Sequence, residues 1–147
     1  MKGSEMMFEK IMVAIDGSAH SMKAVDASIE LAKKGNGQVD IIYVTPVLAH
    51  YMRDSAQMIV ALGKKLTEEA NSIMEEATNK FKDSGVEYIT TIKTGDAADV
   101  IIREAEEKGT QVIVMGSRGL GAISRFVIGS VSTKVLTHAP CSVFIIR

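Results

Sequence analysis

The stretch VIVMGSRGLGAISRFVIGSVS, residues 112–132, contains the pattern on which both the fold and the candidate site depend. It begins with an apolar run, 112–115, that is typical of a strand buried on both faces. The glycine turn 116–119 (GSRG) follows, and nine residues later Gly129-Ser130 opens a short helix. Glycine lets the backbone approach a ligand closely, and the first N–H groups of a helix donate to anions. The stretch therefore predicts a phosphate-binding site at the end of a buried strand.

Strand and helix patterns alternate along the rest of the chain. Apolar residues three and four apart after the N-cap residue Ser18 indicate a helix that ends at Gly35. The same helical pattern predicts further helices at 59–81, 97–108 and 130–138. Short runs of apolar or β-branched residues bounded by turn residues predict strands at 10–16, 39–44, 86–93, 111–115 and 142–147. Strands joined by helices imply right-handed βαβ units and a parallel sheet covered on both faces.

Length and composition predict one domain, 1–147, with residues 1–9 as a flexible lead-in. The net charge of −1 argues against a nucleic-acid surface, which needs a basic excess. No window is apolar enough to span a membrane, and residues 1–10 lack the apolar stretch of a signal peptide. A single cysteine, Cys141, excludes an intramolecular disulfide and a cysteine-based zinc site. We therefore expect a cytoplasmic protein.

The first, second and fourth predicted strands end at Asp16, Val44 and the glycine turn 116–119, which are suited to a ligand. In open parallel sheets, ligands bind beyond the carboxyl ends of the strands, where the strand order reverses. Asp16 ends the first strand and can accept hydrogen bonds from ribose or from an adenine amine, or it can simply cap the first helix. Arg118 can meet the outer phosphates or lie solvated on the surface, and the hydroxyls of Ser130 and Ser132 can add hydrogen bonds.

Two common nucleotide motifs are incomplete in the glycine stretch. A Walker sequence needs a lysine where Ala122 stands. The dinucleotide motif GxGxxG, begun at Gly119, needs a glycine where Ser124 stands. Both absences weaken the interpretation as a P-loop NTPase or as a dinucleotide-binding enzyme.

The glycine pattern of residues 116–130 matches G-x2-G-x9-G-[ST], and by it the chain resembles the ATP-binding universal stress proteins. Three further segments agree with that family in the right order. They are IMVAIDGS at 11–18, TGDAADVI at 94–101 and HAPCSVFIIR at 138–147. The resemblance covers nearly the whole chain.

This resemblance implies a three-layer α/β/α sandwich, Rossmann-like and adenine nucleotide alpha hydrolase-like, with a five-stranded parallel sheet of order 3-2-1-4-5. The expected ligand is ATP, or ADP or AMP, with Mg²⁺ or Mn²⁺ held mainly by the phosphates. By the resemblance, Ala14, Asp16 and Val44 line the adenine and ribose side of the site, with Met115 beside them. The nucleotide-binding residues expected for the ribose and phosphates are Gly116, Ser117, Arg118, Gly119, Gly129, Ser130, Val131 and Ser132.

Three functions fit these features. The first is a binding module in which an adenine nucleotide controls a stress-response or regulatory partner. The second is a weak ATPase or a phosphoryl- or nucleotidyl-transfer enzyme, although no Walker lysine and no Asp pair suited to magnesium is evident, and no catalytic residue is predicted. The third is a nucleotide-free structural dimer. A homodimer is expected in any case through 142–147, because an apolar edge strand invites pairing with another chain.

Other polar residues are expected to be structural. His20, His50 and His138 show no metal-ligand spacing. Asp96 with Asp99 is typical of a helix cap and a first-turn acid. The charged residues of 104–108 are expected to form a solvated helix face.

The long connection 45–57 allows two interpretations. It closes over the ligand, or it simply extends the following helix. Met52, Met58 and Met74 are expected to fill gaps in the core.

Overall fold

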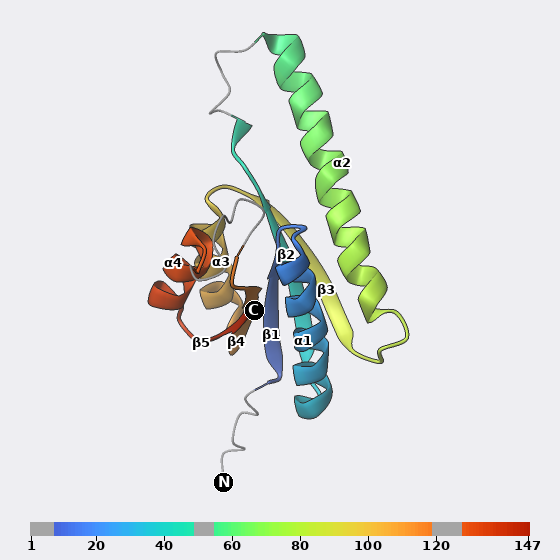
Figure 1. Cartoon of the computed structure of the whole chain (residues 1–147), viewed down its shortest axis with the longest axis vertical. Helices are drawn as coiled ribbons and strands as arrows, with labels where there is room; N and C mark the ends of the chain where they lie inside the picture. Colours follow the sequence, from blue (N-terminus) through green and yellow to red (C-terminus); the bar gives the residue numbers. More distant parts are fainter. Residues whose placement is uncertain (1–7, 49–54, 119–127) are drawn as a thin grey trace.

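The computed structural model describes residues 8–48, 55–118 and 128–147 and contains a sheet covered by helices on both faces (Figure 1). The strands are β1 (Lys10–Ile15), β2 (Gln38–Thr45), β3 (Glu87–Thr94), β4 (Val112–Gly116) and β5 (Ser142–Ile146). The helices are α1 (Ala19–Gly35), α2 (Ala56–Phe81), α3 (Ala97–Lys108) and α4 (Ser130–His138). The sheet order is β3-β2-β1-β4-β5 and every pairing is parallel, so the predicted fold class is confirmed.

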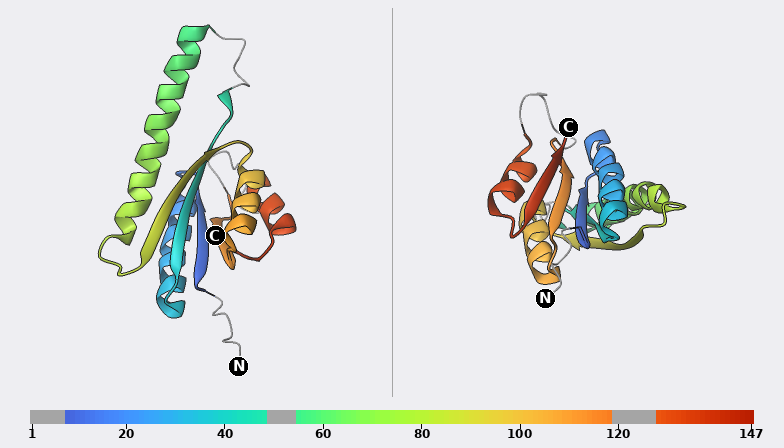
Figure 2. Two further views of the ribbon diagram at one scale, coloured as in Figure 1. Left: turned by 180° about the vertical axis from the view of Figure 1, so that it is seen from behind. Right: turned by 90° about the horizontal axis from the view of Figure 1, so that it is seen from below.

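Alternate residues of the central strands enter two separate cores. Ile11 and Val13 of β1 face α1 and α2, whereas Met12 and Ala14 face α3 and α4. Figure 2 shows the two helical layers on opposite sides of the sheet. Because both faces are buried, a central strand needs apolar residues at nearly every position, which explains the near-continuous apolar runs in the sequence.

Helix α2 is longer than the sheet that it covers, and its first half extends past the end of the sheet (Figure 1). Only its second half has fully buried residues, from Ala70 to Phe81. Met74 fills the core as predicted, but Met58 is 59% exposed, so that prediction was wrong. The reason is that no strand of the described residues lies beneath the first turns of the helix. Neither α2 nor any other helix in the described ranges has the length and hydropathy needed to cross a membrane.

The connection before α2 is partly accounted for. Ser55 is the N-cap of α2, so the end of the 45–57 segment does extend the helix. Residues 49–54, which include His50 and Met52, lie outside the described residues.

A charged cluster lies between β2 and α3, where a solvated helix face was expected. The Lys108 ammonium donates to Asp40 Oδ2 (2.6 Å) and to Thr91 Oγ1 (2.9 Å), and it lies 3.4 Å from Glu104 Oε1. Asp40 and Glu104 are only 7% and 6% exposed. The prediction was therefore wrong for Glu104 and Lys108. Burial alone would lower the pKa of Lys108, but the hydrogen bonds and charges of Asp40 and Glu104 raise it above its ordinary value.

Candidate functional site

A cavity of about 410 Å³ opens where β1, β2 and β4 end and where α3 and α4 begin. Ten of the twelve predicted site residues line it: Ala14, Asp16, Val44, Met115, Gly116, Arg118, Gly129, Ser130, Val131 and Ser132. Ser117 is buried next to these residues without lining the cavity. Gly119 lies outside the described residues. The strand order therefore brings most of the predicted residues together, as a reversal between β1 and β4 requires.

The cavity has an apolar floor, which comes from three adjacent strands. Ala14 pairs in register with Ile42 on one side and with Met115 on the other, and all three face α3 and α4. Ala97 and Ile101, one turn apart on α3, form a wall.

Sequence reasoning missed five of the lining residues, namely Ile15, Ser21, Ile42, Ala97 and Ile101. A signal was present for one of them, since Ile42 stands two positions before Val44 and so shares its face of the strand. The two α3 residues required knowledge of which helix covers that face of the sheet.

Asp16 lies at the cavity, with one carboxylate oxygen already used by the chain. The backbone N–H of Ser18 donates to Asp16 Oδ1 (2.9 Å). The N-cap of α1 is Ser18, whose Oγ accepts from the N–H of Ser21 (3.1 Å). Asp16 therefore stabilises the turn before α1 rather than capping it. Among the described residues, nothing donates to its second oxygen, Oδ2, which remains available to a ligand.

Gly116 allows the end of β4 to pass very close to the start of α1. A Cβ atom at this position would lie 2.8 Å from the carbonyl carbon of His20 and 3.0 Å from the backbone nitrogen of Ser21. Contacts this short with backbone atoms cannot be relieved by moving a side chain. The glycine is therefore required by the packing, whether or not a ligand is bound.

The start of α4 is tied to the end of β4 by two hydrogen bonds. The N–H of Gly129 donates to the Ser117 carbonyl (2.7 Å), and Ser132 Oγ donates to the Gly116 carbonyl (2.8 Å). The Ser132 hydroxyl proton is thus already committed. Gly129, the N-cap, supplies no side chain to the N–H groups of the first turn. These N–H groups face the cavity end of the helix, where an anion is favoured.

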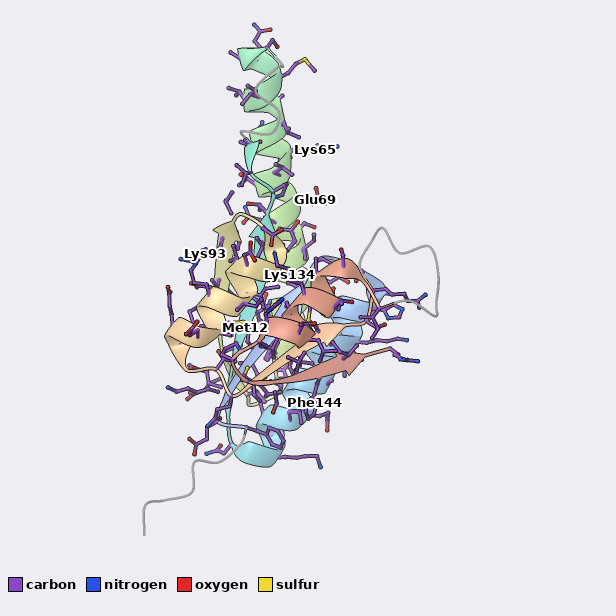
Figure 3. All side chains as sticks on the ribbon, turned by 90° about the vertical axis from the view of Figure 1, so that its left-hand side faces the viewer. Met12, Lys65, Glu69, Lys93, Lys134 and Phe144 are labelled. Carbon is purple, nitrogen blue, oxygen red and sulfur yellow. The ribbon has the colours of Figure 1, made fainter. Side chains whose placement is uncertain are left out.

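Two charged side chains, Asp16 and Arg118, are found among the described residues that line the cavity. Lys134 is close by on α4 (Figure 3) but pairs with Asp99 (2.7 Å) and Asp96 (3.4 Å) at the start of α3. Its hydrogen bond to Asp99 raises the pKa of Lys134, and the N–H of Asp99 lowers the pKa of the Asp96 carboxyl. Asp96 is the cap of α3, as predicted.

The guanidinium of Arg118 contacts a histidine rather than a carboxylate. It lies 2.9 Å from Nε2 of His20, whose Nδ1 is 3.2 Å from Ser117 Oγ. No ion pair to Arg118 occurs among the described residues. In the same part of the chain, no group of three or more His, Cys, Asp or Glu side chains is arranged to hold a metal ion.

Comparisons with known proteins find relatives in both sequence and fold. A family model described as "Universal stress protein family" matches residues 7–147. Universal stress protein YxiE of Bacillus subtilis is 36% identical over 148 residues, which cover 96% of this chain and 100% of that protein. Universal stress protein UspA from Lactobacillus plantarum has the same fold, with a TM-score of 0.83 at 23% identity over 95% of this chain and 98% of that one. A universal stress protein family protein from Arabidopsis thaliana, solved with AMP bound, gives a TM-score of 0.69 at 25% identity, covering 94% and 90%.

Proposed function

Because this chain belongs to the universal stress protein family, we propose that it binds an adenine nucleotide, with ATP as the preferred ligand, and acts as a nucleotide-dependent stress-response module. The observation that carries the proposal is a single cavity whose lining combines apolar strand residues with a strand-end glycine, the start of α4 and Arg118. We place this activity in the cytoplasm, where a lone thiol stays reduced and a protein partner can read the nucleotide state.

Each group of lining residues suits one part of the nucleotide. The apolar floor around Ala14 and Ile42 suits a flat base, and the free oxygen of Asp16 suits an amine or a ribose hydroxyl. At the other end, Gly116, the first N–H groups of α4 and the Arg118 guanidinium suit phosphates. A cavity of about 410 Å³ falls within the range of ordinary ligand sites. The AMP bound to the Arabidopsis protein supports the same ligand class.

A divalent cation, Mg²⁺ or Mn²⁺, is proposed to accompany the nucleotide and to be held mainly by its phosphates. Arg118 would share the task of balancing the phosphate charge.

Nucleotide analysis tests the proposal directly. Purified protein is denatured, the released nucleotide is identified by chromatography and mass spectrometry, and ATP, ADP and AMP are titrated into the emptied protein. We expect an adenine nucleotide in the extract and saturable ATP binding below millimolar concentration, with ADP formation close to background. Failure of all three nucleotides to bind at millimolar concentration would overturn the proposal. Steady ATP hydrolysis well above background would instead favour the enzyme alternative.

We also propose that two copies of the chain pair through residues 142–147, the segment that contains β5. The strand order places β5 at one edge of the sheet, and Phe144 on it is 38% exposed (Figure 3). The carbonyl of Ile146 accepts from Ser117 on the β4 side, so the backbone groups of Ile145 point away from β4. Those outward groups are the ones that a second copy would use.

Proline at Ile145 is expected to convert the dimer to a monomer, because it removes an outward N–H without breaking the ladder to β4. Light scattering after size-exclusion chromatography measures the mass of the unsubstituted protein and of Ile145→Pro. Ile145→Val is the matched control and should remain dimeric. A monomeric mass for the unsubstituted protein, or a dimeric mass for Ile145→Pro, would contradict pairing through β5.

A further inference from the structure

His20 joins the start of α1 to the glycine turn after β4. It is the second residue of α1, its ring is half-buried, and its two nitrogens contact Ser117 Oγ and the Arg118 guanidinium. The two partners are adjacent in the chain but lie 97 and 98 residues from His20. The contact is therefore a product of the strand order, which sets β1 and the start of α1 beside β4.

The hydrogen bonds fix the protonation of the ring. A guanidinium has only donors, so Nε2 of His20 must accept from Arg118 and carries no proton. A neutral imidazole has one N–H, which must then be on Nδ1 and donate to Ser117 Oγ. His20 is thus a neutral residue that holds a cation.

This arrangement leaves the charge of Arg118 available. A carboxylate in the place of His20 would hold the guanidinium equally well but would neutralise it. Among the described residues, no carboxylate forms an ion pair with Arg118, which lines the cavity next to the start of α4. An unsupported arginine would also lose rotamer entropy when it met a phosphate.

We propose that His20 is a positioning residue that holds Arg118, still charged, toward the phosphates of the bound nucleotide. This inference rests on the proposed function and deepens it. It assigns to His20 and Arg118 a share of the discrimination between adenosine phosphates and unphosphorylated adenosine.

Two amide substitutions of different length separate positioning from packing. The amide oxygen of glutamine reaches the place of Nε2, whereas the amide of asparagine reaches only that of Nδ1. We expect His20→Gln to bind ATP within about twofold of the unsubstituted protein, and His20→Asn to bind it about tenfold more weakly, the usual cost of one hydrogen bond to a charged group. Adenosine should bind both variants within about twofold of the unsubstituted protein. Equal losses of ATP and adenosine, or equal effects of the two variants, would overturn the proposal.

A double-mutant cycle tests the coupling. Arg118→Met should weaken ATP binding on its own but add little in the His20→Asn background, because the two residues act as one unit. If the fold-losses in ATP affinity of the two single variants multiply in the double variant, His20 does not act through Arg118.

The tautomer supplies a readout that needs no nucleotide. Nitrogen-15 NMR of the emptied protein should show His20 protonated at Nδ1, and the Nε2–H tautomer would overturn the inference even if ATP binds. If the unsubstituted protein binds no adenine nucleotide, the proposed function fails first, and the tautomer still decides whether His20 holds Arg118.

Discussion

Gly116→Val is expected to abolish nucleotide binding and to lower the free energy of unfolding by about 3 kcal/mol, at the upper end of what overpacking usually costs. The added Cβ would meet backbone atoms of His20 and Ser21 at 2.8 to 3.0 Å. Relief requires moving the start of α1 away from β4. Such a shift would carry His20 away from Arg118 and would widen the turn that faces the phosphates.

Urea denaturation and ATP titration of the same preparation measure the two effects of Gly116→Val. Gly85→Ala is a suitable control, because Gly85 has a φ of +76° but no atom within 4 Å of its added Cβ. Strain at that turn should cost about 1 kcal/mol of stability and leave ATP affinity unchanged. ATP binding by Gly116→Val at the parental affinity would show that the close approach of β4 and α1 is not needed by the site.

Lys108→Met is expected to lower the free energy of unfolding by about 3 kcal/mol, because it leaves Asp40 buried without its cation and Glu104 with only the more exposed Lys93, 4.0 Å away. Lys80→Met is a closely matched control. Both lysine side chains are 34% exposed, but the Asp40 side chain is 9% exposed and Asp26, the partner of Lys80, is 60% exposed. Removing the exposed pair should cost less than about 1 kcal/mol. If urea denaturation gave equal losses in the free energy of unfolding for Lys108→Met and Lys80→Met, the distinction between the buried and the exposed pair would be contradicted.

A second substitution and the pH dependence of stability test whether uncompensated buried charge causes the loss in Lys108→Met. Asp40→Asn should recover part of the stability lost in Lys108→Met, since it removes one of the stranded charges. The raised pKa of Lys108 also has a direction in pH. Its contribution to stability is complete below about pH 10.4, the ordinary lysine value, and is lost as the pH rises through the higher pKa of the folded state. Lys108→Met should lack this alkaline loss.

Most of the fold could be predicted because local patterns determine it. The second strand was expected at 39–44 and lies at Gln38–Thr45, and the fifth was expected at 142–147 and lies at Ser142–Ile146. A short, near-continuous apolar run bounded by turn residues is typical of a strand in a parallel sheet. The strand ends then locate the cavity, because the carboxyl ends of parallel strands meet at one edge of the sheet.

The errors concern side chains whose surroundings come from distant segments. Glu104 and Lys108 have the spacing of a solvated face, and nothing near them in the chain shows that Asp40 is buried opposite. His20 carries no motif, and its partners are nearly a hundred residues away. Met58 was expected in the core as a methionine, but it lies near the start of a helix that continues beyond its sheet.

The pairing of β1 with β4 makes nucleotide binding depend on the folding of nearly the whole chain. Ala14 and Met115 are register partners across the cavity floor, although the chain between them makes up most of the molecule. The cavity cannot form in either half of the chain alone, so a nucleotide bound there stabilises only the complete fold. A ligand present at a hundred times its Kd adds about 2.7 kcal/mol to the free energy of unfolding. We therefore expect the lifetime of the protein against proteolysis to rise and fall with the nucleotide supply of the cell.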